Sequence, residues 1–203
     1  DLRTKLKGPV CYEVATLIRK IGDVYDQQRN YDTAWEYYLR SQKMYQDLQI
    51  EEAKEIADLY NNMGVTKINK KLYDEGIEYY NKSLEIYAKL PGSQKEYANT
   101  LDNLGNAYDS KTQFERALEL HKQALEIRVS IFGPDHEDVA DSYTNYGIVL
   151  KNVKKYDEAI SYHNKATAIY IKARGKYDID VGHSHYNLGS AYFETDELDK
   201  AQE

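Results

Sequence analysis

The chain has 203 residues and a formal net charge of −7, with 41% hydrophobic and 30% charged residues, a composition typical of a folded protein. The acidic balance argues against general binding to nucleic acid or to an anionic membrane, because both need clustered lysine and arginine. One cysteine excludes an internal disulfide and suits a reducing compartment, and no apolar run approaches the ~18 residues of a membrane span. We therefore expect a cytoplasmic protein. The first residue, Asp1, suggests a fragment.

A glycine flanked by large residues recurs along the chain at a nearly fixed spacing. The five copies read KIGDVY (20–25), NMGVTK (62–67), NLGNAY (103–108), NYGIVL (145–150) and NLGSAY (187–192), and their glycines lie 41 or 42 residues apart. Around the third copy, Leu101, Leu104, Gly105 and Tyr108 fall on one helical stripe, and a second stripe follows after a turn. A glycine inside a helix costs roughly 1 kcal/mol relative to alanine. Its recurrence therefore indicates close packing in an array of helix pairs.

In chain order, the repeats are predicted at 8–50, 51–92, 93–132, 133–174 and 175–203, the last being truncated, while residues 1–7 end a helix of a preceding repeat. The Gly-Pro pairs at 8–9 and 133–134 are expected to end one helix and start the next. A small residue is required in each second helix, where helices cross closely. It is found at Ala34, Gly76, Ala117, Ala159 and Ala201. Both ends of the array should expose apolar surface, which favours self-association.

The pattern of a hydrophobic residue before the glycine, an aromatic three after it and a small residue twelve after it resembles the tetratricopeptide repeat, over essentially the whole chain. The long period resembles the repeat variant of kinesin light chains. The GNAY motif (105–108) is similar to the repeats of Leu-Gly-Asn-type polarity adaptors. The resemblance implies an all-α, right-handed superhelical solenoid of antiparallel helix pairs, forming a single array over residues 1–203. It also implies a non-catalytic scaffold whose concave groove binds a peptide segment of a partner protein.

Asparagine precedes the glycine by two positions in four repeats, at Asn62, Asn103, Asn145 and Asn187. This position points away from the packed stripe. A carboxamide can both donate to and accept from a peptide backbone, and in related repeats such an asparagine ladder holds bound peptides. The alternative is that each asparagine bonds a neighbouring helix or water. The same geometry gives these further candidates for a peptide-binding face: Arg19, Asp23, Asp26, Asp58, Asn61, Asn99, Asp102, Asn106, Asp109, Asp141, Thr144, Lys151, His183, Tyr186, Phe193 and Glu194.

Acidic residues outnumber basic ones among these candidates, which favours a peptide carrying lysine or arginine, with an aromatic or apolar anchor near Tyr186 and Phe193. The alternative is an ordinary solvated helix surface. Repeats that grip a C-terminal carboxylate with acidic neighbours need cations at several of these places. Here the matching places hold Asn, Asp and Val, so binding of acidic tails is not expected.

No phosphate-binding loop, zinc spacing or HExxH motif is present. His183 and His185 diverge by about 200° on a helix, which is poor geometry for a shared metal, while His121 and His163 are expected to pack inside their own repeats. Cys11 has no evident basic partner. We therefore predict no catalytic activity, cofactor or metal. The alternatives to a peptide-binding adaptor of motor-cargo or polarity type are a structural spacer that self-associates and a regulatory repeat region of a larger enzyme or NTPase.

Overall fold

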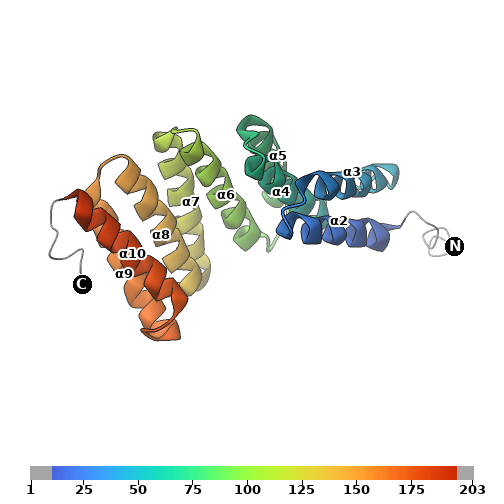
Figure 1. The fold of residues 1–203 in the computed structure, drawn as a ribbon. Helices are drawn as coiled ribbons and strands as arrows, with labels where there is room; N and C mark the ends of the chain where they lie inside the picture. Colours follow the sequence, from blue (N-terminus) through green and yellow to red (C-terminus); the bar gives the residue numbers. More distant parts are fainter. Residues whose placement is uncertain (1–10, 196–203) are drawn as a thin grey trace. The chain divides into compact units, whose positions relative to one another are not determined.

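The computed structural model describes residues 11–195, and the regular structure of this range is entirely α-helical (Figure 1). Nine helices are described there: α2 (Tyr12–Gln27), α3 (Tyr31–Asp47), α4 (Lys54–Asn69), α5 (Tyr73–Tyr87), α6 (Gln94–Ser110), α7 (Phe114–Phe132), α8 (Glu137–Asn152), α9 (Tyr156–Arg174) and α10 (Ile179–Glu194). They pack as antiparallel pairs, which confirms the expected all-α repeat array. The predicted helix end at 1–7, the Gly-Pro pair at 8–9 and Ala201 lie outside the described residues.

The chain divides into two compact units, Asp1–Asn103 and Leu104–Glu203, with the boundary inside α6. In the first unit α2 pairs with α3 and α4 with α5. In the second, α7 packs on the end of α6, α8 pairs with α9, and α10 packs on α9. No helix within residues 11–195 has both the length and the apolar character that crossing a membrane requires.

The two helices of each pair are joined by a three-residue turn whose middle residue has left-handed backbone. These residues are Arg29, Lys71, Thr112 and Lys154, with φ between 59° and 62°. The next N–H then donates to a carbonyl five residues earlier, as from Leu72 to Lys67 at 2.9 Å. This bond gives a partner to a carbonyl in the last turn of the first helix. A left-handed residue other than glycine costs roughly 1–2 kcal/mol. The closure of every turn by the same bond stabilises the sharp reversal of the chain.

The recurring glycines make room for a ring from the paired helix. A Cβ atom at Gly22 or Gly64 would lie 2.6 Å from Cε1 of Tyr38 or Tyr80, and one at Gly105 or Gly147 would lie 2.7 Å from an atom of His121 or His163. Since such distances are far below van der Waals contact, only glycine fits without displacing the ring. The ring-bearing residues are at most 2% exposed. His121 and His163 therefore pack inside their own repeats, as predicted.

Gly76 replaces the alanine of the other second helices for a local reason. A Cβ atom there would lie 2.6 Å from Cδ1 of Ile68, four residues after the repeat glycine Gly64. The other repeats have Asp26, Asp109, Lys151 and Phe193 at the position of Ile68. Ile68 thus fills the volume that the alanine methyl group occupies elsewhere. The requirement for a small residue is confirmed, and at this position even alanine would be too large.

Glycines with positive φ also mark the connections between repeats. Gly92, Gly133 and Gly175 have φ of 80°, 81° and 86°, so Gly133 ends α7 as expected. The prediction that Pro134 starts the next helix is wrong. That helix begins at Glu137, because the side chain of His136 accepts a hydrogen bond from the N–H of Asp138 and so caps α8.

Candidate peptide-binding surface

In the first unit, the predicted asparagines form a connected chain of hydrogen bonds across α2, α4 and α6. Asn103 Nδ2 donates to Asn61 Oδ1 at 3.0 Å, and Asn61 Nδ2 donates to Asn62 Oδ1 at 3.2 Å. Asn62 Nδ2 in turn donates to Asp23 Oδ1 at 2.7 Å. We call these four residues the amide ladder. It joins three successive first helices. Its side chains are half-buried, so they stay partly in contact with water.

The amide ladder leaves hydrogen-bonding capacity for a ligand. A carboxamide has two N–H donors and two acceptor positions, and Asn103 uses one donor while Asn62 uses one of each kind. In this unit the structure shows the alternative interpretation, bonding to neighbouring helices. The amides bond neighbouring helices, and each still offers groups that a peptide backbone could meet.

The carboxylates near the amide ladder are largely paired. Arg19 lies between two of them, with NH1 at 2.9 Å from Asp23 Oδ2 and NH2 at 3.9 Å from Asp58 Oδ2. Lys54 lies 3.5 Å from Asp58 and 2.7 Å from Glu96, and its hydrogen bond lowers the pKa of Glu96. These carboxylates are therefore less available to a basic ligand than the count of candidate residues suggested.

A small pocket lies beside the carboxylates of Asp23 and Asp26. The pocket has a volume of about 130 Å³. It is lined by Asp23, Asp26, Gln27, Tyr38, Asn62 and Val65. Burial raises the pKa of Asp26, although the hydroxyl of Thr66 donates to it at 2.6 Å. A cationic group in this pocket would favour the charged carboxylate.

In the second unit the asparagines are placed differently. Asn145 on α8 and Asn187 on α10 are half-buried, and neither makes a side-chain hydrogen bond to another residue of the described range. Lys151 Nζ donates to Ser190 Oγ at 3.0 Å, which shows that the corresponding faces of α8 and α10 adjoin. Tyr186 and Phe193 on α10 are 76% and 64% exposed. This unit thus presents unbonded amides beside exposed aromatic rings.

The remaining candidates are divided between surface and interior. Asn106 is exposed and Asp141 is exposed while accepting a hydrogen bond from the Tyr170 hydroxyl at 2.6 Å. Asp102 is only 5% exposed, so its carboxylate has little surface to offer a ligand. The helical wheel alone did not predict this, because it does not say what covers the outer edge of a stripe.

Sequence reasoning did not identify Lys54, Thr66 or Thr100 as part of this surface. Thr100 donates to Asn61 at 3.4 Å and Thr66 to Asp26 at 2.6 Å, which ties the carboxylate and amide groups to the next repeat. These bonds join residues 39 and 40 positions apart. In the sequence, the signal for these bonds is a pair of polar residues separated by about one repeat period.

Among residues 11–195, no group of three or more His, Cys, Asp or Glu side chains is arranged to hold a metal ion. The side chain of His183 is 72% exposed and lies 3.9 Å from Asp180. Cys11 is buried and has no disulfide partner.

These features define the chain as an all-α repeat protein with a polar surface on its first helices. The chain belongs to the tetratricopeptide repeat family, whose sequence model matches residues 55–130, 111–172 and 138–203. Repeat domains of this family are generally protein-interaction modules and typically non-catalytic. No curated protein is similar enough to this chain to count as a match.

Several solved structures share the fold. BtubC (BKLC) from P. vanneervenii is 23% identical with a TM-score of 0.81, over 94% of this chain and 76% of its own. A kinesin-light-chain-like array of nearly identical repeats from Podosopora anserina is 18% identical with a TM-score of 0.77, over 91% and 88%. A signal-transduction ATPase with a tetratricopeptide repeat sensor, from Pyrococcus horikoshii, is 17% identical with a TM-score of 0.78, over 94% of this chain but 29% of its own. At these identities the likeness concerns the fold.

Proposed function

We propose that this chain is a non-catalytic scaffold that binds a peptide segment of a partner protein on the first-helix face of its repeats. The observation that carries the proposal is the pair Asn145 and Asn187, half-buried amides that bond no other described side chain. A half-buried carboxamide without a protein partner loses hydrogen-bond energy that a peptide backbone could restore.

The partner peptide is expected to be extended, with an apolar or aromatic side chain against Tyr186 and a basic residue elsewhere. Tyr186 offers a large ring that is already exposed, so little reorganisation opposes the contact. Exposed Asp141, in the same unit as Tyr186, supplies negative charge. Because Asp23 and Asp58 are paired with Arg19, the preference for a basic peptide rests on fewer groups than the sequence suggested.

The narrower roles proposed are a motor-cargo adaptor, as the kinesin-light-chain-like period suggests, or a polarity adaptor. A regulatory repeat region of a larger enzyme or NTPase is the alternative. It is supported by the likeness to the Pyrococcus horikoshii protein, a signal-transduction ATPase with a tetratricopeptide repeat sensor. We prefer the adaptor because its function needs only the first-helix surface of the repeats.

Replacing both asparagines should remove binding without unfolding the protein. Peptides selected from a random phage-displayed library against the wild-type chain would be measured by fluorescence anisotropy against the Asn145→Ala/Asn187→Ala variant. Each lost hydrogen bond contributes about 1 kcal/mol, so the Kd should rise about tenfold or more. Asn164→Ala on α9, which is exposed, is the matched control and should leave the Kd unchanged.

Equal affinity of the double variant and the Asn164→Ala control would refute the amide role. Selected peptides with an acidic centre, or an affinity independent of salt, would refute the charge preference.

Self-association is the second candidate function, and a specific apolar stripe favours it. Leu17, Ile21 and Val24 on α2 are 58%, 42% and 51% exposed. The residues at the same three positions in the next repeat are Leu59, Met63 and Thr66, each of which is 0% exposed. The stripe on α2 therefore has the chemistry of a stacking face between repeats but lacks a cover within residues 11–195.

If this stripe drives association, the wild-type chain should show concentration-dependent mass by light scattering, and the triple variant Leu17→Gln/Ile21→Gln/Val24→Gln should be a monomer. Leu39→Gln on α3, where Leu39 is 43% exposed, is the control and should associate like the wild type. A wild-type chain that stays monomeric up to about 1 mM would contradict this candidate, because an association weaker than that is worth less than about 4 kcal/mol.

A further inference from the structure

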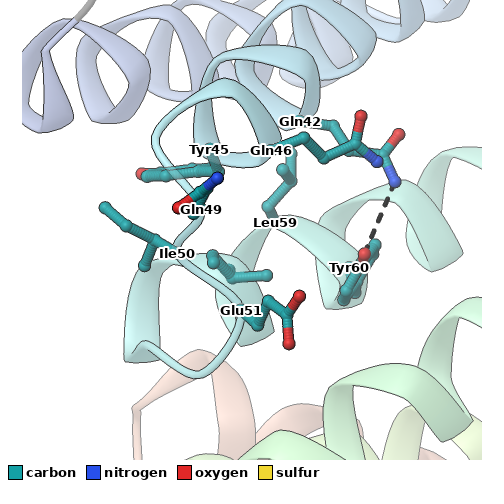
Figure 2. Close-up of a pocket in the computed structure, with 9 residues that line it drawn as sticks. Gln42, Tyr45, Gln46, Gln49, Ile50, Glu51, Leu59 and Tyr60 are labelled. Carbon is teal, nitrogen blue, oxygen red and sulfur yellow. Dashed lines mark hydrogen bonds between the residues drawn. The ribbon is translucent and has the colours of Figure 1, made fainter.

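The first unit contains a second recess, away from the amide ladder, between the C-terminal half of α3 and the start of α4. Its volume is about 600 Å³, within the range of sites for small organic groups. It is lined by Gln42, Tyr45, Gln46, Gln49, Ile50, Glu51, Ile56, Leu59 and Tyr60. Figure 2 shows these side chains gathered beneath the end of α3. We call this recess the glutamine pocket.

Three glutamines line the pocket, at places where the other repeats are mainly apolar. Gln42 and Gln46 lie four residues apart on one stripe of α3, and Gln49 follows in the turn. At the place of Gln42 the other second helices carry Leu84, Leu125 and Thr167, and at the place of Gln46 they carry Ala88, Val129 and Ile171. The residues at the place of Gln42 are buried or half-buried, so a glutamine there is not explained by stability. The place of Gln46 is nearer the surface, with Ile171 40% exposed.

Gln49 adds a second departure. Its φ is 57°, whereas the connections after the other second helices place a glycine in the left-handed region, at Gly92, Gly133 and Gly175. A left-handed residue other than glycine is strained by roughly 1 kcal/mol or more. The turn at Gln49 closes as the other turns do, with the N–H of Ile50 donating to the carbonyl of Tyr45 at 3.0 Å. Its left-handed backbone therefore belongs to the turn, and the side chain of Gln49 contributes to the pocket.

The lining combines an apolar floor with a polar rim. Tyr45, Ile56 and Leu59 are at most 5% exposed and form the floor. In Figure 2 the amides of Gln42 and Gln46 lie together on one side, and Gln49 lies beside Tyr45 on the other. Gln42 Nε2 reaches the Tyr60 hydroxyl at 3.5 Å, the limit of a hydrogen bond, so most donors and acceptors of the three amides remain available.

The charge of the lining limits the ligand. Glu51 is the charged residue among those that line the pocket, and it is exposed. With a carboxylate at the rim and no lysine or arginine in the lining, an anionic ligand would be repelled and a cationic one attracted.

We propose that the glutamine pocket binds a peptide segment in which an aliphatic side chain enters the apolar floor while the flanking backbone amides pair with Gln42, Gln46 and Gln49. Neutral or basic flanking residues are accepted and acidic ones are excluded by Glu51. The site is separate from the amide ladder and from Asn145 and Asn187, so it stands whether or not those amides bind a peptide.

The test uses three blocked peptides as probes: acetyl-Ala-Leu-Ala-amide, acetyl-Lys-Leu-Lys-amide and acetyl-Glu-Leu-Glu-amide. Titration is followed by the side-chain amide signals of the glutamines in ¹H–¹⁵N NMR spectra. The neutral and basic peptides should give saturable shifts at Gln42, Gln46 and Gln49, with the basic peptide tightest. The acidic peptide should bind about tenfold more weakly or not at all.

Two variants separate recognition from folding. Gln42→Leu/Gln46→Val introduces the residues that α7 has at the same positions, Leu125 and Val129, and should weaken binding about tenfold or more. Gln49→Gly removes one amide and relieves the left-handed strain, so it should fold at least as well as the wild type and still bind more weakly. Gln123→Leu on α7, an exposed glutamine, is the control and should bind normally.

The proposal is overturned if neither the neutral nor the basic peptide gives saturable shifts up to about 10 mM, or if the acidic peptide binds equally well. It is also overturned if Gln49→Gly and Gln42→Leu/Gln46→Val bind like the Gln123→Leu control. An Asn61→Ala/Asn62→Ala variant should bind these probes like the wild type, so failure of the amide ladder and failure of this pocket are distinguishable.

Discussion

Replacing Gly64 by alanine should destabilise the first unit by about 1–2 kcal/mol, although alanine is the better helix former. The new methyl group would lie 2.6 Å from Cε1 and 2.7 Å from Cδ1 of Tyr80, and 3.2 Å from the carbonyl oxygen of Gly76. Tyr80 is 2% exposed and has no room to move its ring aside. Overpacking a well-filled core typically costs about 1–3 kcal/mol, which exceeds the ~1 kcal/mol gained in helix propensity.

Gly182→Ala is the matched control, because nothing lies within 4 Å of a Cβ atom at that position of α10. The equivalent residues in the other repeats are Ala15, Ala57, Ala98 and Ala140. This variant should be stabilised by about 0.5–1 kcal/mol. Urea unfolding followed by circular dichroism would measure both effects.

A double-mutant cycle tests the assigned cause of the Gly64 effect. In a Tyr80→Ala background the ring is absent, so Gly64→Ala should become neutral or stabilising. A Gly64→Ala variant as stable as Gly182→Ala, or an equal loss in both backgrounds, would show that the ring contact does not explain the glycine.

Acidification should weaken the second unit through His163. This imidazole is 0% exposed, and neither ring nitrogen has a hydrogen-bond partner in the described range. Burial, assisted by the charge of Lys151, lowers the pKa of His163 from 6.5 to about 4. The folded state therefore holds the neutral ring at pH values where the unfolded chain binds a proton.

The sign and size of the effect follow from linkage. Between about pH 6.5 and pH 4 the unfolded state binds more protons, so the free energy of unfolding falls as the pH falls. The difference between the two pKa values corresponds to about 3 kcal/mol in full, and about 2 kcal/mol is lost by pH 5. Stability at neutral pH is unaffected, because the ring is neutral in both states there.

His163→Tyr should remove this loss while keeping the packing, since Tyr38 and Tyr80 occupy the same place over Gly22 and Gly64. The quantity to compare is the change in urea midpoint between pH 7.5 and pH 5. His183→Tyr is the control, because the side chain of His183 is 72% exposed. If His163→Tyr loses as much stability on acidification as the wild type and the control, the buried imidazole is not the acid-sensitive group.

The repeat class could be predicted from the sequence because it depends on local spacing. Five glycines 41 or 42 residues apart, each with a small residue twelve positions later in the described copies, specify a close crossing of two helices within one repeat. The positions of α2–α10 and the burial of His121 and His163 follow from that short-range pattern. The left-handed residues of the turns do not, because Arg29, Lys71, Thr112 and Lys154 carry no glycine signal.

The candidate surface depended on tertiary structure, because hydrogen bonds between repeats join side chains about 40 residues apart. In the sequence, Asn62, Asn103, Asn145 and Asn187 occupy the same helical position and cannot be told apart. Only the packed helices distinguish Asn62 and Asn103, which bond Asp23 and Asn61, from Asn145 and Asn187, which bond no other described side chain. Likewise, only packing decides that Asp102 is buried and that three glutamines surround a pocket. Periodicity fixes the direction of a side chain from its own helix axis, whereas burial and bonding depend on what the neighbouring repeat places opposite it.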